Sequence, residues 1–255
     1  MYERELKVAK LAVERAKKIL LNYHRKELEV SNKIGVDIVT NADLEAEKII
    51  ANTLKKNFPD YGILAEEGGT EGNQDKKWII DPLDGTYNFS RGSEIFGITI
   101  ALEINKSVVL GIIDLPVLKE QFIAIKNKGA FMNKKRISVS NVKGESSSVI
   151  LGGGWFAKES KENESKGVKL AKDYNYGFRR YGSAIYSLAL VASGRAEAMI
   201  STRHKTWDVS AGCLMIEEAG GICTDFNGNH WSKSSGKYIS SNKVIHKEIL
   251  AILRE

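Results

Sequence analysis

The first apolar positions of the chain recur at alternating steps of three and four residues. They are Leu6, Ala9, Val13, Ala16, Leu20 and Tyr23. This spacing places them on one face of an α-helix, so the pattern predicts a long amphipathic first helix. A second helix is predicted to begin at Thr40 and to end before Pro59, because proline cannot continue a helix.

Short apolar runs bounded by turn residues predict strands in the next part of the chain. They cover residues 61–66, 77–81, 96–104, 107–114 and 121–126. Residues 141–148, Asn-Val-Lys-Gly-Glu-Ser-Ser-Ser, are polar and predict a boundary between an N-terminal lobe, 1–143, and a C-terminal lobe, 144–255. The second lobe is expected to contain a strand at 148–153. Four helices should follow, around 158–173, at 184–194, at 209–221 and from about 243.

Composition indicates an ordinary globular protein. Of the 255 residues, 42% are hydrophobic and 27% charged, and no apolar run approaches the ~18–20 residues of a membrane span. The N-terminus lacks the apolar centre of a signal peptide. Cys213 and Cys223 could form one disulfide, but two free thiols in a reducing compartment are favoured. We therefore expect a cytoplasmic protein that does not contact a membrane.

The net charge of +6 raises the question of nucleic-acid binding. The lysines are scattered, however, and no block of five or more Lys or Arg residues occurs. Nucleic-acid binding is therefore not expected. A basic surface remains compatible with attraction of anionic substrates.

The candidate chemistry centres on residues 78–92, Trp-Ile-Ile-Asp-Pro-Leu-Asp-Gly-Thr-Tyr-Asn-Phe-Ser-Arg-Gly. Pro82 and Gly85 predict that Asp-Pro-Leu-Asp-Gly forms a tight turn at the end of a strand. Asp81, Asp84 and the carbonyl of Leu83 then offer three oxygen ligands within four residues. Oxygen ligands favour hard divalent ions such as Mg²⁺ or Mn²⁺ over zinc.

Two further acidic positions carry both a functional and a structural interpretation. Glu66 and Glu67 follow a strand-like run and could equally form a solvated loop. Asp208 falls where a helix is expected to begin and could equally cap that helix. Taken singly, neither position establishes a metal site.

Together these segments resemble the inositol monophosphatase family of Mg²⁺-dependent, lithium-sensitive phosphatases. The similarity rests on Asp-Pro-Leu-Asp-Gly-Thr-Tyr-Asn-Phe (81–89), Thr-Trp-Asp-Val-Ser-Ala-Gly (206–212) and Ala-Glu-Glu-Gly-Gly (65–69). It also includes 33–43, the stretch 182–184 and the order of all blocks. The resemblance implies an α+β fold, the layered αβαβα sandwich of the inositol monophosphatase and fructose-1,6-bisphosphatase type.

The resemblance also implies roles for individual residues. The metal ligands would be Glu66, Asp81, the Leu83 carbonyl, Asp84 and Asp208, holding two or three Mg²⁺ ions, with Mn²⁺ as an alternative. Thr86, Glu67 and Asp43 would position the attacking water. Asp43 has a structural alternative as well, because Thr40 and Asp43 have the spacing of a capping box at a helix start.

For the substrate, the resemblance assigns Asp84, Gly85 and Thr86 to the phosphate and Gly182, Ser183 and Ala184 to the rest of the molecule. In animal inositol monophosphatases, an acidic residue contacts inositol seven positions before the aspartate that matches Asp208. That position is Ser201 here, which argues against strict inositol specificity. Arg179, Arg180 and Arg203 could hold a second phosphate, or could simply be surface residues.

The sequence therefore predicts a Mg²⁺-dependent phosphatase for inositol 1-phosphate, fructose 1,6-bisphosphate or both, acting as a homodimer. One alternative is a 3′(2′),5′-bisphosphate nucleotidase, although Tyr87-Asn88-Phe89 departs from the Lys-Glu-Phe typical of that branch. A second alternative is a family member that acts mainly as an RNA- or transcription-associated binding protein. The complete set of carboxylates favours catalysis.

Overall fold

The computed structural model describes residues 2–32, 38–153, 166, 169–170, 176–232 and 236–254. Its core is an eight-stranded sheet with the order β10-β9-β8-β7-β6-β5-β3-β4. Neighbouring strands are antiparallel except for the parallel pair β3 and β5. The strands are β3 (Gly62–Ala65), β4 (Gly69–Glu71), β5 (Lys76–Asp84), β6 (Gly97–Ile104), β7 (Ser107–Leu115), β8 (Glu120–Ile125), β9 (Gly129–Met132) and β10 (Lys135–Arg136).

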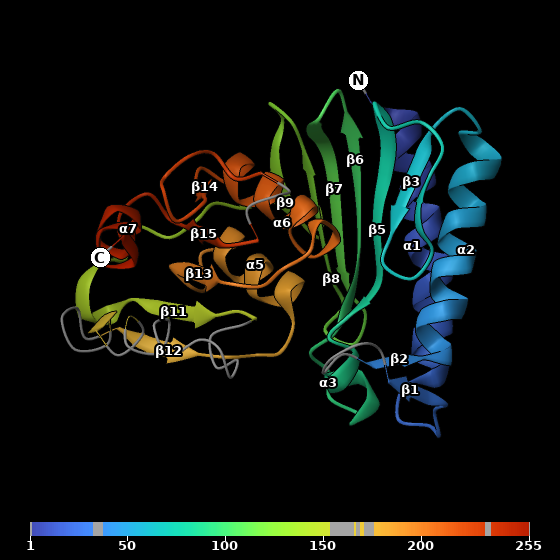
Figure 1. The fold of residues 1–255 in the computed structure, drawn as a ribbon, viewed down its shortest axis with the longest axis horizontal. Coiled ribbons are helices and arrows are strands. Elements are labelled where there is room, and N and C mark those ends of the chain that lie inside the picture. Colours follow the sequence, from blue (N-terminus) through green and yellow to red (C-terminus); the bar gives the residue numbers. More distant parts are fainter. Residues whose placement is uncertain are drawn as a thin grey trace.

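Two long helices cover one face of this sheet (Figure 1). They are α1 (Glu3–Tyr23) and α2 (Asn41–Asn57). Their apolar faces, including Ala12, Leu20 and Ile50, are fully buried against Trp78 and its neighbours in one hydrophobic cluster. The three-and-four spacing of the sequence therefore gave the correct helical face for α1.

The opposite face of the sheet packs on α5 (Ala184–Ala192) and α6 (Thr206–Glu218). These helices form the middle layer, and a second hydrophobic cluster joins them to both sheets. Glycine residues allow α6 to approach both β7 and α5 closely. A Cβ on Gly111 of β7 would lie 3.1 Å from the Cβ of Ala211 in α6, and one on Gly212 would lie 2.7 Å from the Cβ of Leu188 in α5.

A five-stranded sheet lies beyond the middle layer, in the order β12-β11-β13-β15-β14, and α7 (His246–Arg254) covers its outer side (Figure 1). Its strands are β11 (Ser148–Leu151), β12 (Gly177–Arg179), β13 (Ala198–Ser201), β14 (Ile222–Thr224) and β15 (Tyr238–Ser241). The remaining elements are β1 (Val30–Asn32) paired with β2 (Ile38–Thr40), the short helix α3 (Thr86–Ser90) and the 3₁₀ turn η1 (Gly144–Ser146).

The layers run helix, sheet, helix, sheet, helix, so the expected αβαβα sandwich is confirmed. Both cysteines are free and buried, as expected. The helix expected around 158–173 falls largely outside the described residues. The division at residue 143 stays a prediction, because one hydrophobic cluster spans both proposed lobes.

The described part of the chain contains no helix long and apolar enough to cross a membrane.

The contact between α5 and α6 leads to a stability prediction. Gly212→Ala should destabilise the protein by about 1–3 kcal/mol, because its methyl group overlaps Leu188, although Ala is otherwise favoured over Gly in a helix by up to ~1 kcal/mol. The midpoint of urea unfolding would measure the change. In a Leu188→Ala background the cost of Gly212→Ala should fall but not vanish, because Cγ and Cδ1 of Leu188 are removed while its Cβ remains. An unchanged cost there would contradict the packing described.

Candidate active site

The two aspartates of residues 81–84 lie on a β-bulge, not in the predicted tight turn. Strand β5 continues to Asp84, with Asp81 paired to Thr99 and Asp84 paired to Gly97 of β6. An advance of three residues along β5 therefore matches an advance of two residues along β6, which defines the bulge. Pro82 has no N–H to donate to the ladder, which suits it to an irregular position. The extra residue places both aspartates on the same face of the sheet, whereas residues three apart in a regular strand face opposite sides.

Asp84 is held by the start of helix α5. Its carboxylate accepts a hydrogen bond from the hydroxyl of Ser183 and bonds of 3.2 Å from the N–H groups of Ala184 and Ile185. The predicted substrate stretch 182–184 thus contacts a predicted metal ligand directly. Asn88 fixes the preceding segment, because its amide donates 2.7 Å to the carbonyl of Tyr181.

Glu66 and Glu67 lie in the turn between β3 and β4, and a residue missed in the sequence holds this turn. The carboxylate of Glu47, on the buried side of α2, accepts bonds of 2.9 and 2.7 Å from the N–H groups of Glu67 and Gly68. The available signal was a carboxylate on the apolar face of a helix, at i+4 from Asp43.

Asp43 forms the capping box that the sequence offered as its structural role, and it also contacts Thr86. Thr40 and Asp43 form a capping box at the start of α2, with 2.9 Å between the N–H of Thr40 and Oδ2 of Asp43. The other oxygen, Oδ1, accepts a 3.2 Å bond from the hydroxyl of Thr86. Thr86 Oγ1 also lies 3.0 Å from the Leu83 carbonyl oxygen. Asp43 therefore reaches the site through Thr86.

Asp208 is the third residue of α6, and its Oδ2 accepts a 2.8 Å bond from the N–H of Lys205. The N-cap is Lys205, so Asp208 is not the N-cap itself; it caps the helix from the N3 position through the N–H of Lys205. The same position directs Asp208 into a cavity of about 930 Å³ between the first sheet and the C-terminal half of the chain.

Most of the predicted site residues line this one cavity. They are Glu66, Glu67, Asp81, Leu83, Asp84, Gly85, Thr86, Arg180, Gly182, Ser183, Ala184, Arg203 and Asp208. Asp43 lies behind Thr86. Arg179 does not line the cavity, because it is exposed on β12 and donates to the carbonyl of its neighbour Phe178. Its proposed contact with a second phosphate is therefore not supported.

The cavity has further walls that the sequence did not indicate. Tyr87, Lys205 and Trp207 line it, and they flank the predicted residues Thr86 and Asp208 in the sequence. His204 also lines it, and burial lowers the pKa of its ring to about 4. The imidazole is therefore neutral at neutral pH and adds no charge to the site.

Burial and mutual repulsion dominate the electrostatics of the carboxylates. Burial raises the pKa of Asp81 well above its usual range, and the charges of Glu66, Asp84 and Asp208 raise it further. Burial raises the pKa of Asp84 to about 6 despite its three hydrogen bonds. Burial and the charge of Asp84 likewise raise the pKa of Asp208. Ionised together, these groups destabilise one another unless a cation neutralises them.

The donor chemistry fits a hard divalent ion. The predicted ligands at the cavity are carboxylates and the backbone carbonyl of Leu83, all oxygen donors of the kind that Mg²⁺ prefers. As placed in the described part of the chain, no three His, Cys, Asp or Glu side chains form a closed ligand group. Several carboxylate oxygens are instead engaged by backbone N–H groups and by Ser183.

Comparison with known proteins shows the family of this chain. The model of the inositol monophosphatase family matches residues 1–255. The fructose-1,6-bisphosphatase/inositol-1-monophosphatase of Thermotoga maritima is 37% identical over 227 residues, covering 89% of this chain and 86% of the relative. The Nus factor SuhB of Pasteurella multocida is 36% identical over 233 residues, with the same two coverages.

Among solved structures, the extragenic suppressor protein suhB from Bartonella henselae has a TM-score of 0.91 at 32% identity. The match covers 99% of both chains. The fold and the family are thus supported along the full length.

The crowded carboxylates predict that Mg²⁺ stabilises the protein. A raised native pKa means that ionised Asp81 lowers stability as the pH rises through that pKa. In EDTA at pH 8, Asp81→Asn should therefore melt at a higher temperature than the unsubstituted protein. Saturating Mg²⁺ should raise the melting temperature of the unsubstituted protein by about 5–10 °C and that of Asp81→Asn much less, as followed by scanning calorimetry.

The exposed Asp60 provides the matched control. Asp60→Asn should retain the full Mg²⁺ effect. Equal stabilisation of Asp81→Asn and Asp60→Asn by Mg²⁺ would argue against a cation among these carboxylates.

Proposed function

The chain belongs to the inositol monophosphatase family, a family of phosphatases, and on that basis we propose that it is a Mg²⁺-dependent phosphatase of inositol 1-phosphate and fructose 1,6-bisphosphate. The observation that carries the proposal is the convergence of Glu66, Asp81, Asp84 and Asp208 on one cavity. These residues come from a β-turn, a bulged strand and a helix start. Their burial together has a clear chemical use as a cation site.

In the proposed site, Glu66, Asp81, the Leu83 carbonyl, Asp84 and Asp208 hold Mg²⁺. Bound there, the metal would supply an activated water and neutralise the charge of the phosphate. The residues around it must then orient the water and the ester.

Thr86 is placed to orient the water. Its single hydroxyl proton is donated to Asp43 or to the Leu83 carbonyl, so its oxygen keeps lone pairs that can accept a hydrogen bond from the attacking water. Asp43 is 1% exposed and fixes this orientation from behind. Glu67 lines the same cavity, and its carboxylate is the candidate to accept the proton that the water loses.

The phosphate is proposed to bind where β5 passes into α3. Gly85 has φ of +88°, and a Cβ there would lie 2.9 Å from the carbonyl oxygen of Ile95, so only glycine fits without strain. Gly85 and Thr86 both line the cavity, and their N–H groups are proposed to donate to the phosphate oxygens. The water oxygen bonds to phosphorus, the P–O ester bond breaks, and the alcohol leaves with a proton.

Substrate choice is proposed to depend on the rim of the cavity. Arg180 and Arg203 line it and offer two cations to a second phosphate group, as in a sugar bisphosphate. Ser201, 2% exposed, cannot replace the charge of an acidic inositol contact. This combination favours dual specificity over an enzyme restricted to inositol phosphates, and we expect the active species to be a cytoplasmic homodimer.

A binding function is the second candidate. Relatives of comparable identity are named Nus factor SuhB, including one from Escherichia coli that is 35% identical over 255 residues. Retention of every proposed carboxylate ligand in this chain favours catalysis.

Phosphate release tests the proposal. Inositol 1-phosphate and fructose 1,6-bisphosphate should both be hydrolysed with Mg²⁺ and not with EDTA. Asp84→Asn should lose on the order of a hundredfold or more of the activity, since even residues that only support metal ligands cost 10–100-fold. Preference for 3′-phosphoadenosine 5′-phosphate would instead indicate a nucleotidase, and inactivity toward a broad phosphomonoester panel would favour the binding function.

The arginine pair gives a sharper prediction. Arg180→Gln with Arg203→Gln should lower kcat/KM for fructose 1,6-bisphosphate by about 10–100-fold, because charge-assisted bonds to phosphate are lost. The value for inositol 1-phosphate should change by less than about threefold. Arg179→Gln is the matched control and should change neither. Equal losses on both substrates would exclude a second phosphate at these arginines.

A further inference from the structure

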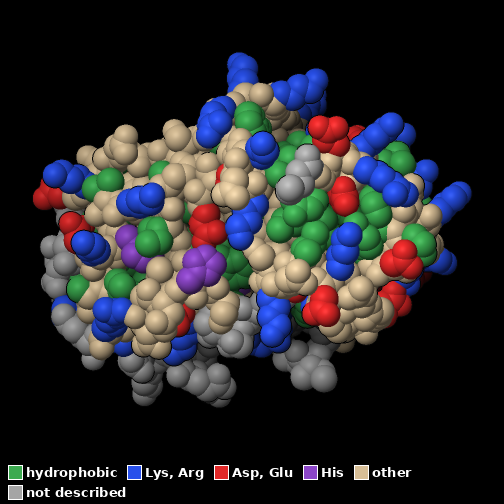
Figure 2. Space-filling model, turned by 90° about the horizontal axis from the view of Figure 1, so that it is seen from above, with side chains coloured by type: hydrophobic (Ala, Val, Ile, Leu, Met, Phe, Trp, Pro, Cys, Tyr) green, Lys and Arg blue, Asp and Glu red, His purple; other side chains and the backbone are tan. Residues whose placement is uncertain are grey.

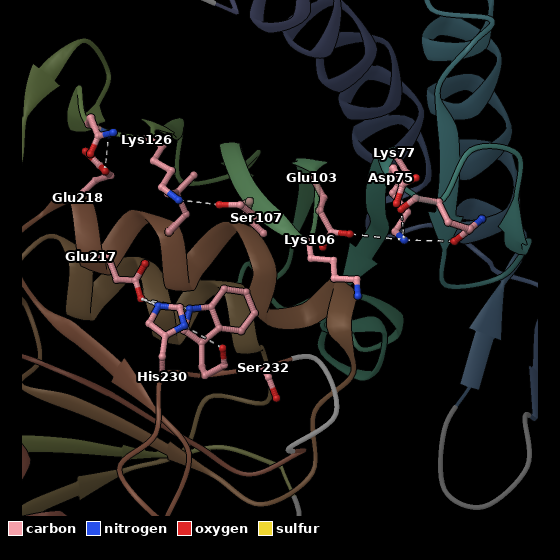
Figure 3. Close-up of a pocket in the computed structure, with 15 residues that line it drawn as sticks. Asp75, Lys77, Glu103, Lys106, Ser107, Lys126, Glu217, Glu218, His230 and Ser232 are labelled. Carbon is pink, nitrogen blue, oxygen red and sulfur yellow. Dashed lines mark hydrogen bonds and ion pairs between the residues drawn. The ribbon is translucent and has the colours of Figure 1, made fainter.

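A second cavity, of about 720 Å³, opens at the end of the sandwich opposite the candidate active site. On one side are the ends of β6, β7 and β8 with the start of β5, and on the other are α6 and residues 230–232 (Figure 3). Its volume lies within the usual range for small-molecule sites. It has no lining residue in common with the first cavity.

The two cavities share structural elements but lie far apart. Strand β5 contributes Lys77 to the second cavity and Asp84 to the first. Seven residues of strand separate them, which corresponds to ~23 Å. Helix α6 likewise contributes Asp208 to one cavity and Glu217 to the other. The second cavity is therefore not an extension of the active site.

Most acidic side chains of the second cavity are engaged within its wall. Glu218 accepts three backbone hydrogen bonds of 2.7, 3.1 and 2.7 Å from Asn127, Lys128 and Gly129. Glu217 lies 2.8 Å from His230 Nε2 and 3.2 Å from the indole nitrogen of Trp231. These bonds connect the β8–β9 turn and residues 230–231 to α6. The two carboxylates are therefore already engaged before a ligand binds.

A third carboxylate, that of Glu103, forms an ion pair with a lysine of the cavity wall. It is fully buried and lies 3.4 Å from Lys77 Nζ. Lys77 Nζ in turn donates to the carbonyl and the side-chain oxygen of Gln74, at 3.0 and 3.1 Å. The charges of Glu103 and Lys77 are therefore paired with each other inside the cavity wall.

Two lysines retain donor capacity. Lys126 Nζ donates one bond, of 2.6 Å, to Ser107 Oγ, and an ammonium group has three donors. Lys106 forms no ion pair with any residue of the described part of the chain. It sits with Asn105 in a hairpin turn in which both have positive φ, 64° and 49°, and this geometry holds the lysine at the cavity. Asp75, exposed at the rim, and Glu217, whose carboxylate attracts Lys126, partly offset these two cations.

The inner surface adds an apolar component. Trp231 is 8% exposed, and Val108 and Leu214 are also buried there. Lys106, Ser107 and Lys126 lie on the sheet side of the cavity, across from Glu217 and His230 of the other wall (Figure 3). The surrounding face of the molecule carries lysine and arginine side chains across its width, with fewer acidic ones between them (Figure 2).

We propose that this cavity binds a small organic anion, in which an apolar or aromatic body lies against Trp231, Leu214 and Val108 and one anionic group lies between Lys106 and Lys126. The apolar body would gain from leaving water. The anionic group would gain charge-assisted hydrogen bonds from the two ammonium groups.

Fluorescence titration with 8-anilinonaphthalene-1-sulfonate, an aromatic anion, tests the proposal, with N-phenyl-1-naphthylamine as its uncharged counterpart. Lys106→Gln with Lys126→Gln should raise the Kd of the sulfonate at least about tenfold and that of the amine less than about twofold. Ser107→Trp, which fills the cavity mouth, should weaken both. Lys134→Gln with Lys135→Gln, in the exposed β9–β10 turn, is the charge-matched control and should change neither.

An unchanged sulfonate Kd in Lys106→Gln with Lys126→Gln, or an equal rise in the control, overturns the proposal. So does undiminished binding in Ser107→Trp. Competition with 1-naphthoate and 1-naphthylphosphonate then identifies whether a carboxylate or a phosphate-like group is preferred, and displacement by neither also overturns it. None of these measurements requires turnover, so their outcome is independent of the proposed phosphatase activity.

Discussion

The candidate site depends on keeping several buried carboxylates close together against their mutual repulsion. The bulge in β5 turns Asp81 and Asp84 to one side of the sheet, and burial then raises the pKa of both. Such an arrangement is stable only if other groups compensate for the charge. The N–H groups of α5 and the hydroxyl of Ser183 provide part of that compensation at Asp84. A bound cation would provide the remainder.

The middle helical layer determines where the carboxylates of the site lie. Helix α5 contacts Asp84 through its first residues, and α6 presents Asp208 from its first turn. The two helices can approach each other closely because Gly212 has no side chain opposite Leu188. Displacing either helix would therefore move carboxylates that come from different parts of the chain. The geometry of the site therefore depends on how α5 and α6 pack in the middle layer.

The sequence was informative where a local pattern determines structure. Periodicity identified α1, Pro59 marked the end of α2, and Thr40 with Asp43 identified the start of α2. The segment 81–85 was misinterpreted as a turn because Pro and Gly are typical of turns, whereas the pairing that makes it a bulge is with β6, a contact between strands. Glu47 was missed for a similar reason. Its partners lie 20 and 21 residues away, so no local spacing reveals them.

The arginines also show that a local sequence pattern does not reveal contacts set by the tertiary fold. Arg179 and Arg180 are adjacent and chemically identical, yet only Arg180 lines the cavity, because side chains alternate in direction along an extended chain. The choice depends on where β12 sits in the second sheet, which residues 179–180 alone do not encode.

The two cavities contain similar residue types but differ in how their carboxylates are neutralised. In the first, burial and the charges of Asp84 and Glu66 raise the pKa of both Asp81 and Asp208, so the site favours a cation. In the second, Glu217 and Glu218 are engaged by His230 and by backbone N–H groups, so the charge left to a ligand comes from lysine. Counting Asp, Glu and Lys in a lining therefore does not predict ligand charge. The partners that each charged group already has within the wall determine it, because a group satisfied internally gains little from a ligand.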